Sequence, residues 1–241
     1  GHYAKVNRSD GKKAVLCRGK DRKKDQSYFL FGLSQKIIDR LLLPLGDWSK
    51  TDVRKKAANA AFITSDKADS QELCFVGDRQ HARYIEEHFP EETPPEGKLI
   101  DTEGHLLGRH RGIHHYTIGQ RRGFGLSALE RRYVVRLNAA SNEVVLGSKE
   151  ELRATGLKAK PVYWHRDPNV GEKFLVKIRS AHAGVMATVT DLNGSMTVHF
   201  EEPQYAVAPG QAAVLYDGEQ VIGGATILEA CHETFCHKME R

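Results

Sequence analysis

Apolar residues recur at helical spacing in the first third of the chain. Asp25 is a favourable N-cap residue, and Pro44 and Gly46 end the pattern that follows it. The apolar positions between them are Phe29, Leu30, Leu33, Ile37 and Leu41. This spacing predicts one helix that begins near Asp25 and ends before Pro44.

Two further helices are predicted downstream. Ser49 and Asp52 have the spacing of a capping box, with Asp in place of the usual Glu. The apolar stripe expected on that second helix is Val53, Ala57 and Ala61. Asp78 is the predicted cap of the third helix, with Tyr84, Ile85 and Phe89 facing inward. The first ninety residues are therefore expected to be mostly helical.

Two short apolar segments precede these helices. GHYAKV (residues 1–6) and AVLCRG (residues 14–19) predict a strand pair separated by a polar turn. The pair is expected to have no sheet of its own to join, as in a domain that has been cut.

The pattern changes after residues 91–97, EETPPEG, which read as a turn-rich linker. Turn signals occur at Glu103-Gly104, Asn193-Gly194 and Asp217-Gly218. Five strands are predicted near the C-terminus: KFLVKIR, VMATVT, MTVHF, AAVLY and QVIGGATI. Such close spacing indicates a small closed barrel or sandwich, and the boundary between the two β-rich parts is expected near residues 151–160.

Bulk composition indicates a globular protein of two or three modest domains. The chain has 241 residues, of which 40% are hydrophobic and 28% charged. No apolar run approaches the ~18 residues of a membrane span, and the first residues lack the features of a secretory signal. Four cysteines are too few and too uneven for a disulfide framework, so a reducing cytoplasm is expected.

Positive charge is concentrated at one end. Residues 1–60 hold 15 Lys and Arg against 6 Asp and Glu, although the net charge of the whole chain is only +5. Such an excess suits a polyanion, because neutralised phosphates release counterions. A solvated basic face is the alternative.

Cys74 is the candidate nucleophile or sulfur carrier. It lies in DSQELCF, residues 69–75, where a polar, turn-prone approach leads into an apolar run. A thiol reacts as its thiolate, and nearby basic residues favour that form. The alternative is that Cys74 is a small buried apolar residue.

Two polar blocks could contact a nucleic acid. In KDQSYFL, Lys24 could meet a phosphate, whereas Asp25 and Gln26 could hydrogen-bond a base or sugar. Asp25 could equally cap the helix.

In YTIGQRRG, residues 116–123, a strand is expected to end in a glycine-flanked loop whose Arg121 and Arg122 offer forked donors to phosphate. A hairpin with two solvated arginines is the alternative reading of that loop.

The C-terminal segment CHETFCH, residues 231–237, contains four soft ligands. They could bind zinc, although structural zinc sites usually separate the ligand pairs more widely. An unstructured terminus is the simpler reading. Single histidines such as His2, His114 and His115 do not identify a metal site, so none is predicted.

Taken together, these blocks resemble the tRNA-specific 2-thiouridylases, called MnmA in bacteria and TrmU elsewhere. The resemblance runs from Gly1 to about Ile227. It is carried by GHYA, KDQSYFL, DSQELCF, YTIGQRRG, RRYVV, KIR and EEPQYAVAPGQAAVLYDGEQVIGGA.

The resemblance implies a reaction and its residues. Family members use ATP to adenylate the C2 oxygen of a wobble uridine in tRNA, and a cysteine persulfide then delivers sulfur to C2. Cys74 matches the persulfide-bearing cysteine, and Gly1 matches a position beside the ATP adenine. The positions that match tRNA contacts are His2, Lys24, Asp25, Gln26, Arg179 and Gln211, to which the sequence argument adds Arg121 and Arg122.

The implied fold is a multidomain α+β protein. Residues 1–77 would be the helical remnant of an α/β ATP-pyrophosphatase domain, and residues 78–152 a small β-rich central domain that binds tRNA. Residues 153–229 would form a C-terminal antiparallel β-barrel, followed by a tail at 230–241.

The sequence departs from the family pattern in several places. The family's SGGxDS pyrophosphate loop and its second catalytic cysteine would precede GHYA, and Cys17 does not match that cysteine. Ser180 replaces an aromatic neighbour of Arg179, and SALERRYVV is shorter than the glycine-rich family loop.

Three hypotheses follow. The chain is the tRNA-binding, sulfur-carrying part of a cytoplasmic uridine 2-sulfurtransferase, inactive alone, that works with a sulfur-relay donor and with an ATP loop removed or on another chain. Alternatively, it is a non-catalytic tRNA-binding module. Thirdly, residues 231–237 serve a metal-linked or docking role. The first predicts a reactive Cys74, the second predicts tRNA binding that Cys74→Ser leaves unchanged, and the third predicts retained zinc.

Overall fold

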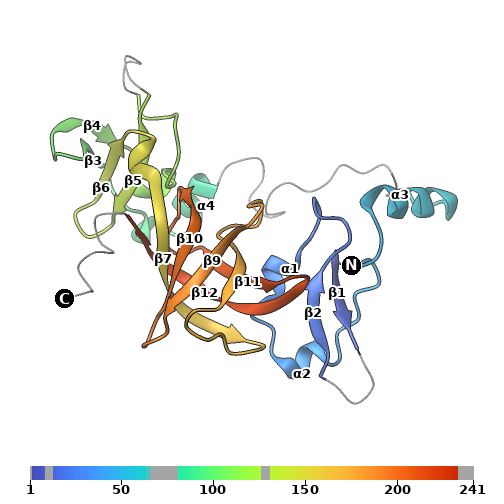
Figure 1. Ribbon diagram of the computed structural model, residues 1–241. Helices are drawn as coiled ribbons and strands as arrows, with labels where there is room; N and C mark the ends of the chain where they lie inside the picture. The colour runs from blue at the N-terminus through green and yellow to red at the C-terminus, as the bar shows by residue number, and fades with distance from the viewer. Residues whose placement is uncertain (1, 9–12, 64, 66–80, 126–130, 233–241) are drawn as a thin grey trace. The chain divides into compact units, whose positions relative to one another are not determined.

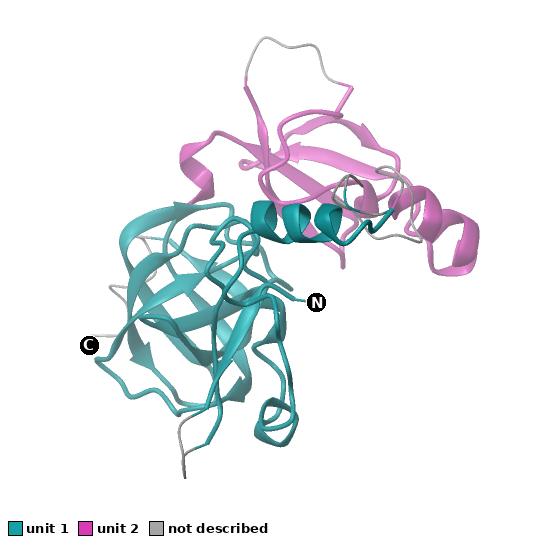
Figure 2. Cartoon of the chain, turned by 90° about the vertical axis from the view of Figure 1, so that its right-hand side faces the viewer, with its two compact units in different colours: residues 1–67, 154–241 teal, residues 68–153 magenta. Residues whose placement is uncertain are grey.

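The computed structural model describes residues 2–8, 13–63, 65, 81–125 and 131–232. The chain forms two compact units, shown in different colours in Figure 2. Unit 1 contains residues 1–67 and 154–241, and unit 2 contains residues 68–153. The N-terminal segment therefore clusters with the C-terminal barrel.

Six strands of unit 1 close into a barrel (Figure 1). Their order is β12-β11-β8-β9-β10-β7, and β7 also pairs with β12. The strands are β7 (Arg153–Trp164), β8 (Lys173–Lys177), β9 (Val185–Asp191), β10 (Met196–Tyr205), β11 (Ala212–Asp217) and β12 (Gln220–Cys231). The five C-terminal strands and the barrel expected from the sequence are confirmed.

Alternating burial produces the barrel core. In β9 and β10, every second side chain points inward, so that both strands present an apolar face. These inward residues are Val185, Ala187, Val189, Met196, Val198 and Phe200. The predicted turns at Gly194 and Gly218 lie between paired strands, and both glycines have positive φ.

The N-terminal strand pair extends this sheet. β1 (Ala4–Asn7) pairs with β2 (Val15–Arg18) in antiparallel register, as expected. The expectation that the pair joins no sheet is wrong, because Cys17 in β2 pairs with Gln220 in β12. β2 therefore pairs with the start of β12 and extends the barrel sheet at that point.

The single helix predicted between Asp25 and Pro44 is instead two short helices. α1 (Ser27–Leu30) and α2 (Gln35–Ile38) are separated by a turn at Gly32, and Ser34 before α2 has extended backbone. The inward residue is the fully buried Ile38, whereas Ile37 is exposed. Helical spacing alone could not reveal the turn between α1 and α2.

The two later helices differ from the sequence prediction in which residues they bury. α3 (Lys50–Asn59) begins as predicted, because the Ser49 hydroxyl accepts a hydrogen bond from the Asp52 backbone N–H. Its apolar stripe is not buried, and Ala61 is exposed. In α4 (His81–His88) the buried residue is Ala82, and Phe89 is exposed rather than inward. The proposed cap Asp78 lies outside the described residues. The described part of residues 1–90 is not mostly helical.

Unit 2 contains a four-stranded sheet in the order β4-β3-β6-β5. Its strands are β3 (Gly97–Asp101), β4 (Leu106–His110), β5 (Tyr133–Asn138) and β6 (Glu143–Gly147). Short 3-10 turns are η1 (Pro90–Glu92), η2 (Ile113–His115) and η3 (Glu150–Leu152). Its core is separate from that of the barrel and contains Leu99, Tyr116, Val134, Val144 and Leu146.

Candidate functional site

The Lys24-Asp25-Gln26 segment is fixed to the strand pair by two of its three side chains. Asp25 is 8% exposed, and its Oδ1 accepts hydrogen bonds from the backbone N–H groups of Gly19 (3.1 Å) and Ser27 (3.0 Å). The Gln26 Oε1 accepts from the Tyr3 backbone N–H at 3.1 Å, and the Gln26 N–H donates to the Tyr3 carbonyl at 2.9 Å. Lys24 is exposed. Asp25 therefore braces the loop before α1, but the N-cap residue of this helix is Gln26, so the capping alternative for Asp25 is wrong.

A buried charged cluster lies behind this segment. Arg18 Nε donates to Asp25 Oδ2 at 3.3 Å, and the Asp25 side chain is completely buried. Lys177 is only 4% exposed, with its ammonium 5.8 Å from the Tyr28 ring centroid. Burial lowers the pKa of Lys177, the Asp25 carboxylate opposes this, and Arg18 adds to it. The cluster therefore contains two cations and one fully desolvated carboxylate.

Hydrogen bonds connect α1 to the barrel wall. The Tyr28 hydroxyl donates to the Ala212 carbonyl at 2.9 Å, and the Ser27 and Tyr216 hydroxyls lie 3.3 Å apart. Burial raises the pKa of Tyr216 far above its usual range, so this hydroxyl stays protonated. Behind α1, His165 Nε2 lies 3.0 Å from the Phe31 carbonyl.

Arg179 and Gln211 lie at one end of paired strands. In the β8–β11 register, Lys177 is opposite Val214, and both predicted residues lie just beyond that pair. Both are exposed. The His182 N–H donates to the Arg179 carbonyl at 3.1 Å, and His182 Nε2 lies 2.9 Å from Gln204 Oε1. Burial lowers the pKa of His182, with smaller contributions in the same direction from Arg179 and Lys177.

The block at residues 116–123 is a turn in unit 2, not the end of a strand. The Gly119 N–H donates to the Val134 carbonyl, and the Val134 N–H donates to the Gln120 carbonyl, which fixes the turn to β5. Gln120 Nε2 also donates to the Arg122 carbonyl at 2.8 Å. Arg121 and Arg122 are exposed.

Phe124, which follows this turn, belongs to the core of unit 2. It stacks on Tyr116 with ring centroids 6.3 Å apart and an interplanar angle of 16°. The Phe124 ring is therefore packed against the core of unit 2.

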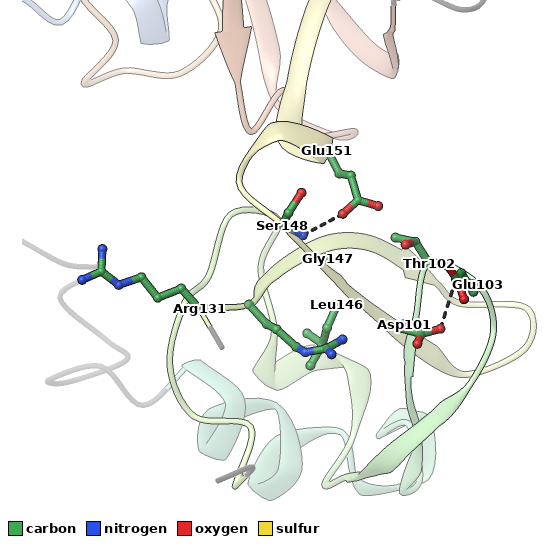
Figure 3. A pocket seen from close by; sticks show the side chains of 9 residues that line it. Asp101, Thr102, Glu103, Arg131, Leu146, Gly147, Ser148 and Glu151 are labelled. Carbon is green, nitrogen blue, oxygen red and sulfur yellow. Dashed lines mark hydrogen bonds between the residues drawn. The ribbon is translucent and has the colours of Figure 1, made fainter. Parts of the chain in front are cut away.

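A cavity of about 410 Å³ also lies in unit 2 (Figure 3). Two of its carboxylates accept hydrogen bonds from the backbone: Glu151 Oε2 accepts from the Ser148 N–H at 2.7 Å, and Asp101 Oδ1 accepts from the N–H groups of Glu103 and His105. Its lining residues are Asp101, Thr102, Glu103, Arg131, Arg132, Leu146, Gly147, Ser148 and Glu151. None of them is a predicted site residue.

Of the remaining predicted site residues, the structure describes only one. His2 is exposed, whereas Gly1 and Cys74 lie outside the described residues. Cys17 is buried, and burial raises the pKa of its thiol, which disfavours the reactive thiolate. Cys231 is partly buried.

Three family models match consecutive parts of the chain. The tRNA methyl transferase HUP domain matches residues 1–78, and the tRNA methyl transferase PRC-barrel domain matches residues 82–148. The aminomethyltransferase beta-barrel domain matches residues 154–227. This order reproduces the three-part organisation implied by the resemblance.

Curated relatives carry one common name, tRNA-specific 2-thiouridylase MnmA. The relative from Halothermothrix orenii is 40% identical over 232 residues, which is 95% of this chain and 64% of that protein. The relative from Trichormus variabilis is 40% identical over 94% of this chain and 65% of its own length. The chain belongs to the tRNA-specific 2-thiouridylase family.

Family membership confirms the resemblance found in the sequence. The chain spans slightly less than two thirds of the length of these 2-thiouridylase relatives. Among the described residues, no helix is both long enough and apolar enough to cross a membrane.

Sequence reasoning missed Arg18 as the ion-pair partner of Asp25, and it missed the buried Lys177, whose pKa burial lowers against the opposing effect of the Asp25 carboxylate. A usable signal was present, because Lys177 follows a strongly apolar strand, FLV, and precedes Ile178. A charged residue in such a position is rarely buried without a counter-ion. The identity of that counter-ion required the tertiary structure.

Proposed function

We propose that this chain takes part in the ATP-dependent 2-thiolation of a tRNA wobble uridine, and that it carries tRNA-binding parts and the sulfur-carrying Cys74. The observation that carries the proposal is family membership along 95% of the chain with proteins named tRNA-specific 2-thiouridylase. The enzyme class is tRNA-uridine 2-sulfurtransferase, acting in the cytoplasm.

In unit 1, the proposed tRNA contacts are His2, Lys24, Gln26, Arg179 and Gln211, with Asp25 supporting the loop. The exposed position of Lys24 beside two internally bonded neighbours supports a role as a phosphate contact on a fixed loop. Arg179, exposed at the end of β8, offers a second cation on this unit.

In unit 2, Arg121 and Arg122 are the proposed phosphate contacts. They lie on a turn whose backbone is bonded to β5 and to Gln120, which restricts the loop while leaving both side chains at the surface. A preorganised loop loses less conformational entropy when it binds.

The sulfur chemistry is assigned to Cys74. Its thiolate would attack the outer sulfur of a persulfide on a sulfur-relay donor protein, and the donor's thiolate would leave. The outer sulfur of the Cys74 persulfide would then attack the adenylated C2 of the uridine, with AMP as the leaving group. The thiolate of the family's second catalytic cysteine would attack the Cys74 sulfur and break the S–S bond, which leaves a disulfide between the two cysteines and the transferred sulfur on C2. Gly1 is the proposed contact to the ATP adenine. Because both residues lie outside the described part of the chain, no geometry is assigned to either step.

The test of this function joins two readouts. The chain is incubated with a sulfane-sulfur donor, and the mass of the Cys74 peptide is measured; addition of one sulfur atom is expected, with Cys74→Ser as the control. In parallel, the affinity for unmodified tRNA is measured for the unaltered chain and for Cys74→Ser. No sulfur on Cys74 together with tight tRNA binding would replace the proposal by the non-catalytic tRNA-binding module. Failure of both would contradict any tRNA role.

A further inference from the structure

Two histidines and one glutamate converge on a single point in unit 2, away from the residues assigned above. Glu86 Oε1, on α4, lies 2.8 Å from His115 Nε2 and 3.2 Å from His114 Nε2, both on η2. One ligand atom from each residue lies within 4.8 Å of the other two. The two imidazole ring centroids are 4.4 Å apart.

The arrangement is held in place from one side. The His114 side chain is only 8% exposed, whereas His115 and Glu86 are progressively more open. The ring of His114 lies directly against Gly112, where a Cβ atom would be 2.4 Å from His114 Cε1. Gly112 also has a φ of +128°, a value that side chains with a Cβ atom rarely adopt. The buried imidazole is therefore fixed before any ligand arrives.

Charge favours a divalent cation between these groups. Two neutral imidazoles and one carboxylate carry a single negative charge, while two protonated rings at such close range would repel each other. The Glu86 carboxylate already contacts both rings. A metal ion joins both neutral imidazoles to the carboxylate without that repulsion.

Two of the three distances are close to those of a coordination shell. Zinc binds imidazole nitrogen and carboxylate oxygen at about 2.0–2.2 Å, so neighbouring ligand atoms around a tetrahedral ion lie about 3.3 Å apart. Glu86 Oε1 lies 2.8 and 3.2 Å from the two imidazole nitrogens, and all three ligand atoms lie within 4.8 Å of one another. Two histidines and one carboxylate are a known ligand set for divalent first-row metals that leaves further coordination positions open.

We propose that Glu86, His114 and His115 bind one divalent first-row metal ion of the zinc type, which joins α4 to η2. Tyr116, a core residue and the start of the turn that carries Arg121 and Arg122, follows His115 directly. The bound ion would therefore fix the base of that turn as well as the position of α4.

The test is a metal titration of the whole chain. Cys74, Cys231 and Cys236 are first replaced by serine, so that thiolate ligands, including those of the CHETFCH segment, are removed. The protein is stripped with a chelator, and zinc binding is measured by calorimetry. Cobalt is then titrated, because its visible absorption reports an ordered set of nitrogen and oxygen ligands. One ion per chain is expected.

Glu86→Gln is the most informative variant, because glutamine keeps a hydrogen-bond acceptor but removes the charge that a metal ion needs. Zinc affinity should fall by more than about 100-fold in this variant and in His115→Ala, since each loses a direct ligand. His88→Ala removes a histidine from the same helix and should change the affinity by less than about threefold. Circular dichroism of each variant establishes that it is folded.

Two results would overturn the proposal. Absence of zinc binding and of cobalt absorption at a large excess of metal would mean that the three residues form only a hydrogen-bonded group. Unchanged affinity in folded Glu86→Gln and His115→Ala would place the bound ion elsewhere. Because neither readout involves tRNA or sulfur transfer, failure here is separate from failure of the proposed function.

Discussion

The two segments assigned to tRNA binding are built in opposite ways. In the Lys24-Asp25-Gln26 segment, two of three side chains are bonded within unit 1, and the buried Asp25 carboxylate forms an ion pair with the partly buried Arg18 close to the buried Lys177. In the 116–123 turn of unit 2, backbone bonds fix the loop and both arginine side chains lie at the surface.

This difference separates residues that shape a binding surface from residues that contact the ligand. A polar triplet in a sequence can be divided between both roles, as at residues 24–26. An arginine pair on a backbone-bonded turn can be entirely available for contact. Substitutions of Asp25 or Gln26 should therefore change stability, whereas substitutions of the exposed Lys24, Arg121 or Arg122 should change affinity alone.

Asp25→Ala should have the largest effect. It removes the buried carboxylate that pairs with the partly buried Arg18 near Lys177, and with it the Oδ1 atom that accepts hydrogen bonds from two backbone N–H groups. Breaking a buried ion pair in this way costs about 3 kcal/mol or more of folding free energy. Urea denaturation of the whole chain measures this loss of folding free energy. Lys24→Ala is the control, with a change within about 0.5 kcal/mol; equal losses in both variants would contradict the division of roles.

Arg121→Ala with Arg122→Ala should weaken tRNA binding without changing stability. Each lost hydrogen bond to phosphate is worth about 1.5 kcal/mol, because the donor is charged. The slope of log affinity against log salt should decrease by about 2, one for each arginine. Fluorescence anisotropy at several salt concentrations measures both quantities. Lys98→Ala, at an exposed position of β3, provides the control from the same unit.

Tyr28→Phe removes only the hydroxyl that bonds α1 to the Ala212 carbonyl. The expected loss is about 1 kcal/mol, since one hydrogen bond is lost while the ring stays packed. Comparison of urea midpoints at equal denaturant slope measures it. An unchanged midpoint would show that α1 is not held to the barrel by this bond.

The smallest effect concerns pH and the support of α1 by His165. Burial lowers the pKa of His165 in the folded protein, so the unfolded chain binds more protons as the pH falls below about 6.5. Folding stability should therefore decrease on acidification through that region. In His165→Gln this decrease should be smaller, whereas the exposed His199→Gln should retain it. The measurement is the urea denaturation midpoint of each protein at a series of pH values. An equal pH dependence in the unaltered chain and in His165→Gln would show that His165 does not contribute.

The sequence predicted the barrel strands well and the helical segment poorly. Strand period and Gly-containing turns such as Asn193-Gly194 are local signals, and they determined β8 to β12. The turn between α1 and α2 depends on tertiary contacts, including that of Tyr163 Oη with the Gln35 N–H. Burial of Ile38 instead of Ile37 has the same origin.

For the candidate site, family motifs predicted residues but not their environments. Lys24, Asp25 and Gln26 are adjacent in sequence, yet only the structure shows that Asp25 faces Arg18 and Lys177. The group of Glu86, His114 and His115 was missed because its carboxylate lies 28 residues from the nearer histidine. Such a separation has no signature in a single sequence.

The most direct test of tRNA recognition by this chain is the affinity of the triple variant Lys24→Ala, Arg121→Ala, Arg122→Ala for unmodified tRNA. We expect the variant to unfold at the same urea concentration as the unaltered chain and to bind at least about 100-fold more weakly, with a shallower salt dependence. Equal affinity and an equal salt slope in a folded variant would contradict the assignment of both segments to tRNA.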